Sequence, residues 1–150
     1  MQLLTFYLNR IKYGLPLDNV ESIENRVEVV SIPRSLEYIK GVINLHGDIV
    51  PIYDLTAKFG YAGLDVNNIV IVNVEGIKVG LEVEHVSEIL SGQDCQMVPM
   101  PRLMNNGNSY FNDVASCKKE LIVLLDVTKL ITKEEQQNIR KLVTAGSQEC

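Results

Sequence analysis

Tryptophan is absent from this 150-residue sequence and aromatic residues make up only 6%, although 46% of the residues are hydrophobic. A folded core must therefore consist mainly of valine, isoleucine and leucine, which favour β-strands and argue against a disordered chain. The apolar runs at 69–72 and 121–125 are far shorter than the roughly 20 residues that a membrane-spanning helix needs. We interpret these runs as buried strands.

Cysteine is scarce as well. The three cysteines, Cys95, Cys117 and Cys150, are an odd number and contain no C-x-x-C pair. The sequence therefore supports neither a disulfide framework nor a zinc site, and we predict reduced thiols. We also expect a cytoplasmic protein, because the N-terminus lacks the basic segment, long apolar core and small-residue cleavage site of a signal peptide.

Positive charge is in deficit. The 14 basic side chains against 19 acidic ones give a net charge of −5 at pH 7. A nucleic-acid-binding protein usually carries a basic face, so this balance argues against a nucleic-acid partner. Anionic membrane surfaces are disfavoured for the same reason, and we predict no direct membrane insertion.

Motifs for catalysis are also missing. His46 and Asp48, with Asp54 downstream, can be interpreted as metal ligands or as an acid-base set, but such groups on one turn are typical of a polar hairpin tip. No nucleophile elbow is present, and Gly41 and Gly47 do not belong to a phosphate-binding loop. We predict that the chain is not an enzyme and binds neither cofactor nor metal.

The most informative segment of the chain is a predicted hairpin. Two apolar runs, at 42–45 and 49–53, flank a His46-Gly47 corner in which glycine can adopt a positive φ. Pro51 cannot donate to a sheet ladder, so we expect the second strand to lie at an edge or to bend there. Asp54 is placed to cap a short helix after the hairpin. A strong structural pattern without chemistry indicates a recognition surface.

The residues of this hairpin resemble a known family. The order G-V-I-N-L-x-G-x-I-V-P-x-x-D-L-x-x-x-F-G over residues 41–60 closely resembles the signature of CheW-like chemotaxis coupling proteins. Residues 13–23 (YGLPLDNVESI), residues 79–89 (VGLEVEHVSEI) and the opening LLTFYL strand extend the resemblance over nearly the whole chain. The sequence is identified on these motifs as a member of that family.

The resemblance implies a fold and a function. It implies a mainly β fold, in which two small five-stranded SH3-like barrels share a core, with short helices and a C-terminal helix. Residues 1–150 would form one domain whose two barrels divide near residues 60–68, with exchange of the N-terminal strand into the second barrel left open. The implied function is a non-catalytic adaptor between the cytoplasmic hairpin of a methyl-accepting chemoreceptor and the regulatory domain of a CheA-like histidine kinase, recruited to membrane-associated receptor arrays.

The resemblance also implies two sets of contact residues. On the receptor side these are Val20, Leu45, His46, Val86 and Ile89, and on the kinase side they are Ile23, Gly41 and Val42. Without the resemblance, Val20, Val86 and Ile89 would be interpreted as ordinary core residues. If Gly41 allows a partner to approach closely, Gly41→Asp should weaken partner binding and leave the fold intact.

One position departs from the family motif. The family has arginine in N-L-R-G, where this sequence has His46. Arginine is always charged, whereas histidine has an ordinary pKa of about 6.5. Three interpretations stay open: an altered receptor tip, weaker binding that tightens at acidic pH, or service as an auxiliary coupling protein. A binding module for a different kinase or motility pathway is the alternative function, and a small hydrolase is a third class without positive support.

The sequence also repeats itself. Residues 13–23 align with 79–89, and Asp54-Leu55-Thr56 is matched by Asp126-Val127-Thr128. We interpret these matches as two similarly built halves. Strands are predicted at 3–8, 12–17, 27–29, 41–45, 49–53, 69–74, 78–83, 86–90, 110–114 and 121–125, with an irregular connection through 97–101 and 105–108. A C-terminal helix should begin at a Thr132/Glu135 capping box, end at Gly146 and pack on the second half.

Overall fold

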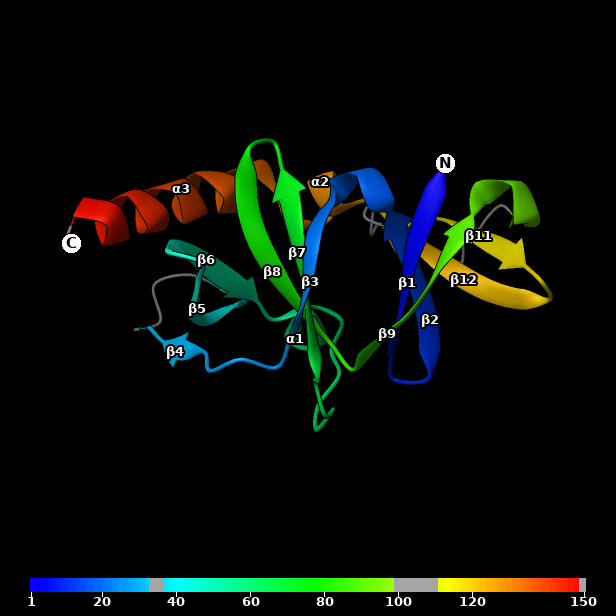
Figure 1. Ribbon diagram of the computed structural model, residues 1–150, viewed down its shortest axis with the longest axis horizontal. Coiled ribbons are helices and arrows are strands. Elements are labelled where there is room, and N and C mark those ends of the chain that lie inside the picture. The colour runs from blue at the N-terminus through cyan, green and yellow to red at the C-terminus, as the bar shows by residue number, and fades with distance from the viewer. Residues whose placement is uncertain (33–36, 99–110, 149–150) are drawn as a thin grey trace.

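The computed structural model describes residues 1–32, 37–98 and 111–148, and its strands form two six-stranded sheets (Figure 1). Sheet A has the order β10 (Cys95–Val98), β11 (Phe111–Cys117), β12 (Glu120–Leu125), β2 (Ile11–Pro16), β1 (Gln2–Leu8) and β9 (His85–Ser91). Sheet B has the order β3 (Val20–Asn25), β7 (Asn68–Val74), β8 (Ile77–Val83), β6 (Asp48–Tyr53), β5 (Ile39–Leu45) and β4 (Val30–Ser31).

Helices occupy only a small part of the described chain. One short α-helix follows the last strand of each half: α1 (Leu55–Lys58) follows β6, and α2 (Val127–Leu130) follows β12. Single 3-10 turns, η1 (Leu17–Asn19) and η2 (Gly92–Asp94), connect strands, and α3 (Lys133–Gln148) ends the chain. The predicted mainly β class is confirmed, with six strands in each sheet where we expected five in each barrel.

The two sheets have the same plan. If β1–β6 are matched one by one with β7–β12, the order of sheet B, β3-β7-β8-β6-β5-β4, becomes the order β9-β1-β2-β12-β11-β10 of sheet A. The first hairpin of each half therefore lies in the sheet of the other half: β1 and β2 join β9–β12, while β7 and β8 join β3–β6.

The repeated sequence segments occupy equivalent places in this plan. Residues 13–23 run from β2 in sheet A to β3 in sheet B, and residues 79–89 run from β8 in sheet B to β9 in sheet A. Each sheet also contains one parallel contact, β12 with β2 and β6 with β8, at equivalent positions. The repeat thus marks the two points at which the chain passes between the sheets.

One hydrophobic core connects the sheets. Its buried members come from sheet A, as with Phe6 and Leu15, and from sheet B, as with Val72 and Leu81. Two satellite clusters lie within single sheets, one around Val50 in sheet B and one around Ile122 and Cys117 in sheet A. Neither half could bury its apolar face alone, because each contributes a hairpin to the other's sheet.

Most strand predictions agree with the structure, and the structure differs from the predictions at three places. Residues 27–29 are not a strand, because the chain pairs before them as β3 and after them as β4. Strand β3 was not predicted. Its residues alternate between half-buried and exposed, and its sequence is too polar to show the apolar pattern of a strand. Met97 and Val98 belong to β10 rather than to an irregular connection. The remaining predicted connection, residues 99–101 and 105–108, lies outside the described residues, as does Tyr110.

The predicted hairpin is present, but its second strand is not at an edge. His46 and Gly47 form the turn with φ values of 52° and 93°. Strand β6 lies between β5 and β8, so the expectation of an edge strand at Pro51 is wrong. The parallel ladder with β8 pairs Ile52 with Gly80 and does not include Pro51, so the missing N–H of proline interrupts no bond there. Asp54 caps α1 by accepting the backbone N–H of Ala57.

The C-terminal helix begins as predicted and ends later. The backbone N–H of Thr132 donates to Glu135 Oε1, and the backbone N–H of Glu135 donates to Thr132 Oγ1, which completes the capping box. The prediction that Gly146 ends the helix is wrong, since α3 continues to Gln148. The helix packs on β6 and β8 of sheet B, not on the second half alone, and Tyr53 donates a 3.0 Å hydrogen bond to Glu135.

The prediction of three reduced thiols is contradicted for two of them. Cys95 and Cys117 lie opposite each other in the β10–β11 ladder and form a disulfide. Their 22-residue separation gives no sequence signal, because only the pairing of two distant strands brings the sulfur atoms together. Cys150 lies outside the described residues.

Gly41 supports a strand of its own sheet. It is buried on β5, and a Cβ added to it would overlap the carbonyl oxygen of Val30 on β4. The structure therefore predicts that Gly41→Asp disturbs the fold at β4, contrary to the expectation that it leaves the fold intact.

We predict that Gly41→Ala, the smallest change that adds a Cβ, displaces β4. The close contact with backbone cannot be relieved by a side-chain rotation, so the expected cost is about 1–3 kcal/mol of unfolding free energy. Amide hydrogen exchange should rise at Val30 and Ser31 while β7 stays protected. An unchanged exchange rate at β4 would contradict the contact. Gly60→Ala is the comparison for backbone strain alone, because its φ is 79° and no atom lies within 4 Å of the added Cβ, so it should leave exchange at β4 unchanged.

Candidate functional site

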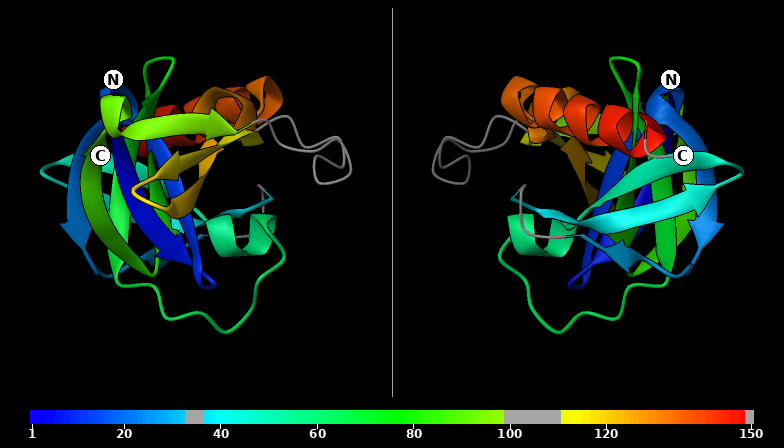
Figure 2. Two further views of the ribbon diagram at one scale, coloured as in Figure 1. Left: turned by 90° about the vertical axis from the view of Figure 1, so that its right-hand side faces the viewer. Right: turned by 90° about the vertical axis from the view of Figure 1, so that its left-hand side faces the viewer.

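One edge strand of each sheet lies on a common face of the molecule. Strand β3 ends sheet B and strand β9 ends sheet A, so each pairs on one side only among the described residues. Figure 1 shows both strands at the front, and the left view of Figure 2 again places them together at one side. Because both strands contain a β-bulge, we call the exposed faces of β3 and β9 the bulged-edge surface.

Both edge strands are bulged at equivalent places. The β3–β7 register shifts between Val20 and Ser22, and the β1–β9 register shifts between Leu4 and Phe6. At the second bulge the hydroxyl of Thr5 donates to the carbonyl of Glu88, whose N–H donates back to the Thr5 oxygen. Bulges turn side chains out of the regular alternation and are common beside functional sites.

Four apolar residues lie on the bulged-edge surface, in two equivalent pairs. Val20 and Val86 are half-buried and pack against the shared core. Ile23 and Ile89 are exposed to 42% and 50%. Because residues 13–23 repeat as 79–89, Ile23 is the counterpart of Ile89 and Val20 that of Val86. The core interpretation therefore fits the two valines better than the two isoleucines.

The predicted sets of contact residues are regrouped by the structure. Ile23, expected on the kinase side, lies with Val20, Val86 and Ile89 on the bulged-edge surface. It is separated within sheet B from β5, which carries Gly41 and Val42, by β7, β8 and β6.

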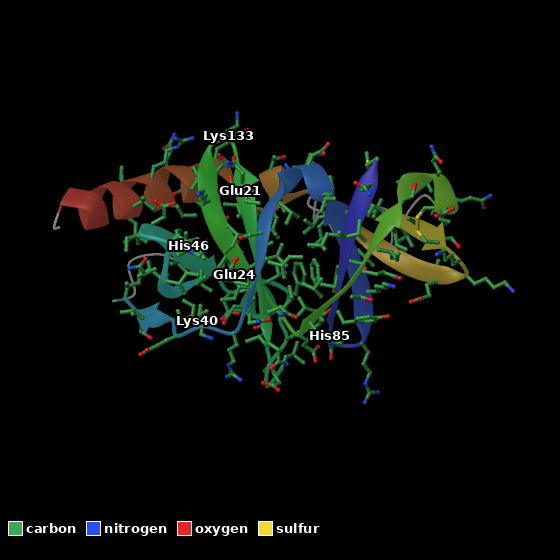
Figure 3. All side chains as sticks on the ribbon, viewed as in Figure 1. Glu21, Glu24, Lys40, His46, His85 and Lys133 are labelled. Atoms are coloured by element: carbon green, nitrogen blue, oxygen red, sulfur yellow. A yellow bond between two sulfur atoms is a disulfide. The ribbon has the colours of Figure 1, made fainter. Side chains whose placement is uncertain are left out.

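The hairpin-tip residues of the receptor set lie elsewhere. Leu45 packs against the satellite cluster of sheet B, and His46 is exposed at the β5–β6 tip. Figure 3 shows His46 to the left of β3, whereas β9 and His85 lie to its right. Leu45 and His46 are therefore not brought together with the four apolar residues of the bulged-edge surface.

Residues 41 and 42 are partly or fully covered. Gly41 is buried beneath β4, and Val42 is half-buried opposite Val30, which is itself 60% exposed. Sequence reasoning missed Val30. Val30 lies on β4, an edge strand of only two residues, which is too short to give a recognisable sequence pattern.

An ion-pair network around the buried Lys12 side chain links β2 to β9 and β12. The Lys12 ammonium, almost wholly buried, lies 2.8 Å from Glu88 Oε1 and 3.5 Å from Glu120 Oε2. Burial lowers the pKa of Lys12, but its hydrogen bond to Glu88 and the nearby negative groups outweigh burial and raise the pKa above 10.5. The hydrogen bond from Lys12, and then its charge, lower the pKa of Glu88 below its ordinary 4.5.

We predict that this network makes the fold sensitive to acid. Because the pKa of Glu88 is lower in the folded state, its stabilising contribution is present above its ordinary pKa and is lost as the pH falls through the folded-state value. Because the pKa of Lys12 is raised in the folded state, its stabilising contribution is present below pH 10.5 and is lost only as the pH rises through the folded-state pKa.

Urea unfolding at several pH values between about 6 and 3 measures this contribution. The difference in stability between wild type and Glu88→Gln should shrink as the pH falls. A difference that stays constant would contradict the role of this pair, and Glu28→Gln, at an exposed position between β3 and β4, is the control.

No candidate metal centre is found in the part of the chain that the structure describes. No group of three or more histidine, cysteine, aspartate or glutamate side chains in it could hold a metal ion. His85 is exposed and stacks on Tyr7 with 4.9 Å between ring centroids. Among the described helices, none is long and apolar enough to cross a membrane.

Comparison with known proteins identifies the family. A family model described as a CheW-like domain matches residues 2–135. The chain belongs to the CheW family. A Chemotaxis protein CheW of Klebsiella aerogenes is 35% identical over 138 residues, which cover 89% of this chain and 83% of that protein. One of Treponema pallidum is 29% identical over 150 residues, covering 94% and 88%.

A solved CheW structure shares the fold. The scaffolding protein TtCheW from Thermoanaerobacter tengcongensis matches with a TM-score of 0.76 and 28% identity, covering 89% of this chain and 94% of that one. The predicted membership of the CheW-like family is therefore confirmed, and the chain belongs to a chemotaxis scaffold family with a mainly β fold. In this CheW-family fold, the bulged-edge surface is the candidate site for protein recognition.

Proposed function

We propose that the chain is a non-catalytic adaptor that couples the cytoplasmic hairpin of a methyl-accepting chemoreceptor to the regulatory domain of a CheA-like histidine kinase. The observation that supports this most is the pair of exposed isoleucines, Ile23 and Ile89, at equivalent places on two bulged edge strands. Exposed β-branched side chains on adjacent edges suit the apolar face of a helix. The adaptor is cytoplasmic and is recruited to membrane-associated receptor arrays.

The receptor contacts in this proposal are Val20, Ile23, Val86 and Ile89, with Leu45 and His46 as a separate contact at the hairpin tip. The kinase contacts are Val42 and the exposed Val30 on β4, while Gly41 acts by holding β4 in place. Ile23 is thus moved to the receptor side, because it shares a surface with its counterpart Ile89. The three interpretations of His46 stay predictions.

Two binding titrations on the full chain test the assignment of partners. The first uses a soluble fragment of the receptor's cytoplasmic hairpin, and the second uses the isolated regulatory domain of the kinase. We expect each to bind alone and both to bind together, because the four apolar receptor contacts lie on β3 and β9, whereas the kinase contacts lie on β4 and in the middle of β5. Binding of the kinase domain without any receptor binding would contradict the receptor assignment and favour a module for a different kinase or motility pathway.

A further inference from the structure

Strand β10 is held to its sheet by few interactions. It has four residues, it is the last strand of sheet A, and it pairs only with β11 among the described strands. Its first residue, Cys95, is bonded to Cys117 on β11, and the disulfide is the yellow bond at the right of Figure 3. Its counterpart in sheet B is β4, an edge strand with no such bond, which is held by the close approach of Gly41.

The disulfide also borders an apolar pocket. A pocket of about 610 Å³ is lined by Cys95, Met97 and Ala115 on one side and by residues such as Leu3 and Leu124 on the other. Met97 is 57% exposed at this pocket although its partner across the ladder, Ala115, is fully buried. The position of β10 therefore determines how open this end of sheet A is.

We propose that Cys95–Cys117 is a redox-controlled latch that holds β10 against β11 when oxidised and releases it when reduced. The reductant is a dithiol, either a small molecule or a protein. A thiolate of the dithiol attacks Cys95, because the Cys117 side is 2% exposed and Cys95 is half-buried at the pocket.

The reaction balances within these partners. The attack forms a mixed disulfide at Cys95 and expels Cys117 as a thiolate, which takes up a proton. The second thiolate of the dithiol then attacks the dithiol's own sulfur in the mixed disulfide, which forms the disulfide of the oxidised dithiol and releases Cys95 as a thiolate. Cys95 is also protonated, so the dithiol supplies the two electrons and two protons that convert the protein disulfide to two thiols. The reduced Cys95 thiol has an acceptor at hand in the carbonyl oxygen of Ser91, 3.6 Å away.

Two features of the molecule favour a redox switch over a permanent structural disulfide. A disulfide in a cytosolic protein is usually transient or redox-sensing, and to this extent the inference rests on the proposed cytoplasmic location. The bond also joins β10 to its one neighbour among the described strands, and the core shared by the two sheets does not include either cysteine. Opening the bond can therefore release β10 while the rest of the fold persists.

Thiol trapping and amide hydrogen exchange on the full chain test the latch. Cys150→Ser removes the third thiol, so that a maleimide mass tag counts only Cys95 and Cys117. The protein is equilibrated in mixtures of reduced and oxidised dithiothreitol, trapped, and analysed by exchange. We expect reduction to raise exchange of the β10 amides, Cys95–Val98, at least tenfold, while β4 and β7 do not change.

A second variant keeps the test independent of trapping. Cys95→Ala/Cys117→Ala should exchange at β10 like the reduced protein in either buffer. The proposal is overturned if the pair forms no disulfide in oxidised buffer, or if β10 exchanges equally in both states. It is also overturned if β7 loses protection together with β10, because the bond would then stabilise the whole fold. None of these readouts depends on a receptor or kinase, so failure of the latch leaves the adaptor function untouched.

Discussion

Replacing Ile89 by aspartate is expected to lower receptor affinity at least tenfold while the fold is retained. Ile89 is half exposed on the edge strand β9, so a carboxylate there stays hydrated in the free protein. In the complex, the same carboxylate would be buried against an apolar helix face without a partner, which is strongly unfavourable. A tenfold loss corresponds to about 1.4 kcal/mol, a modest value for a central interface residue.

The matched control is Leu121→Asp. Leu121 is 65% exposed, lies on β12 of the same sheet, and belongs to neither proposed contact region. Titration of both variants with the receptor fragment, with circular dichroism to verify folding, separates a local contact from a general loss of surface hydrophobicity. Equal affinities for wild type and Ile89→Asp would contradict the bulged-edge surface as the receptor site.

The counterpart Ile23→Asp extends the same test to β3. If both edge strands contact the receptor, this variant should weaken receptor binding and leave kinase-domain binding unchanged. A loss of kinase binding alone would restore Ile23 to the kinase side, where the family resemblance placed it.

Phe6→Ala is expected to lower the free energy of unfolding by about 3–5 kcal/mol, a large share of the 5–15 kcal/mol typical of a domain. The ring is fully buried in the shared core and stacks on Tyr13, with 5.7 Å between centroids. Since this core includes residues of both sheets, the cavity should weaken both together. Urea unfolding gives the loss, and amide exchange reports whether protection falls in β7 as well as in β1.

Ile43→Val provides the comparison in a satellite cluster. Ile43 is buried within sheet B, and the loss of one methylene should cost only about 0.5–1.5 kcal/mol. If Phe6→Ala instead unfolds sheet A while sheet B keeps its protection, the shared core is contradicted, and the two sheets behave as separate folding units.

Local patterns in the sequence predicted much of this fold. The His46-Gly47 turn, the Asp54 cap and the Thr132/Glu135 capping box involve residues within a few positions of each other, so their geometry can be deduced from spacing. The internal repeat predicted two similarly built halves, which agrees with the equivalent strand orders of the two sheets. The turn and the two caps depend on short-range chemistry, which a single sequence contains.

Pairing between distant strands could not be deduced in the same way. The disulfide needs β10 and β11 to align, and the interior position of β6 needs β8 to pair beside it. Strand β3 was missed because its polar alternation is that of an edge strand. For the candidate site, the sequence named the apolar residues of β3 and β9, but only the sheet order shows that Ile23 lies with Ile89 and that Gly41 is covered.

Kinase autophosphorylation in receptor-containing membranes tests the adaptor function most directly. The assay compares receptor membranes and kinase with and without this chain, and includes Leu121→Asp and Ile89→Asp as matched variants. The proposed function predicts receptor-dependent control of the kinase by wild type and Leu121→Asp, and its loss with Ile89→Asp. Kinase activity that is the same with and without the wild-type chain, although both partners bind it, would contradict coupling.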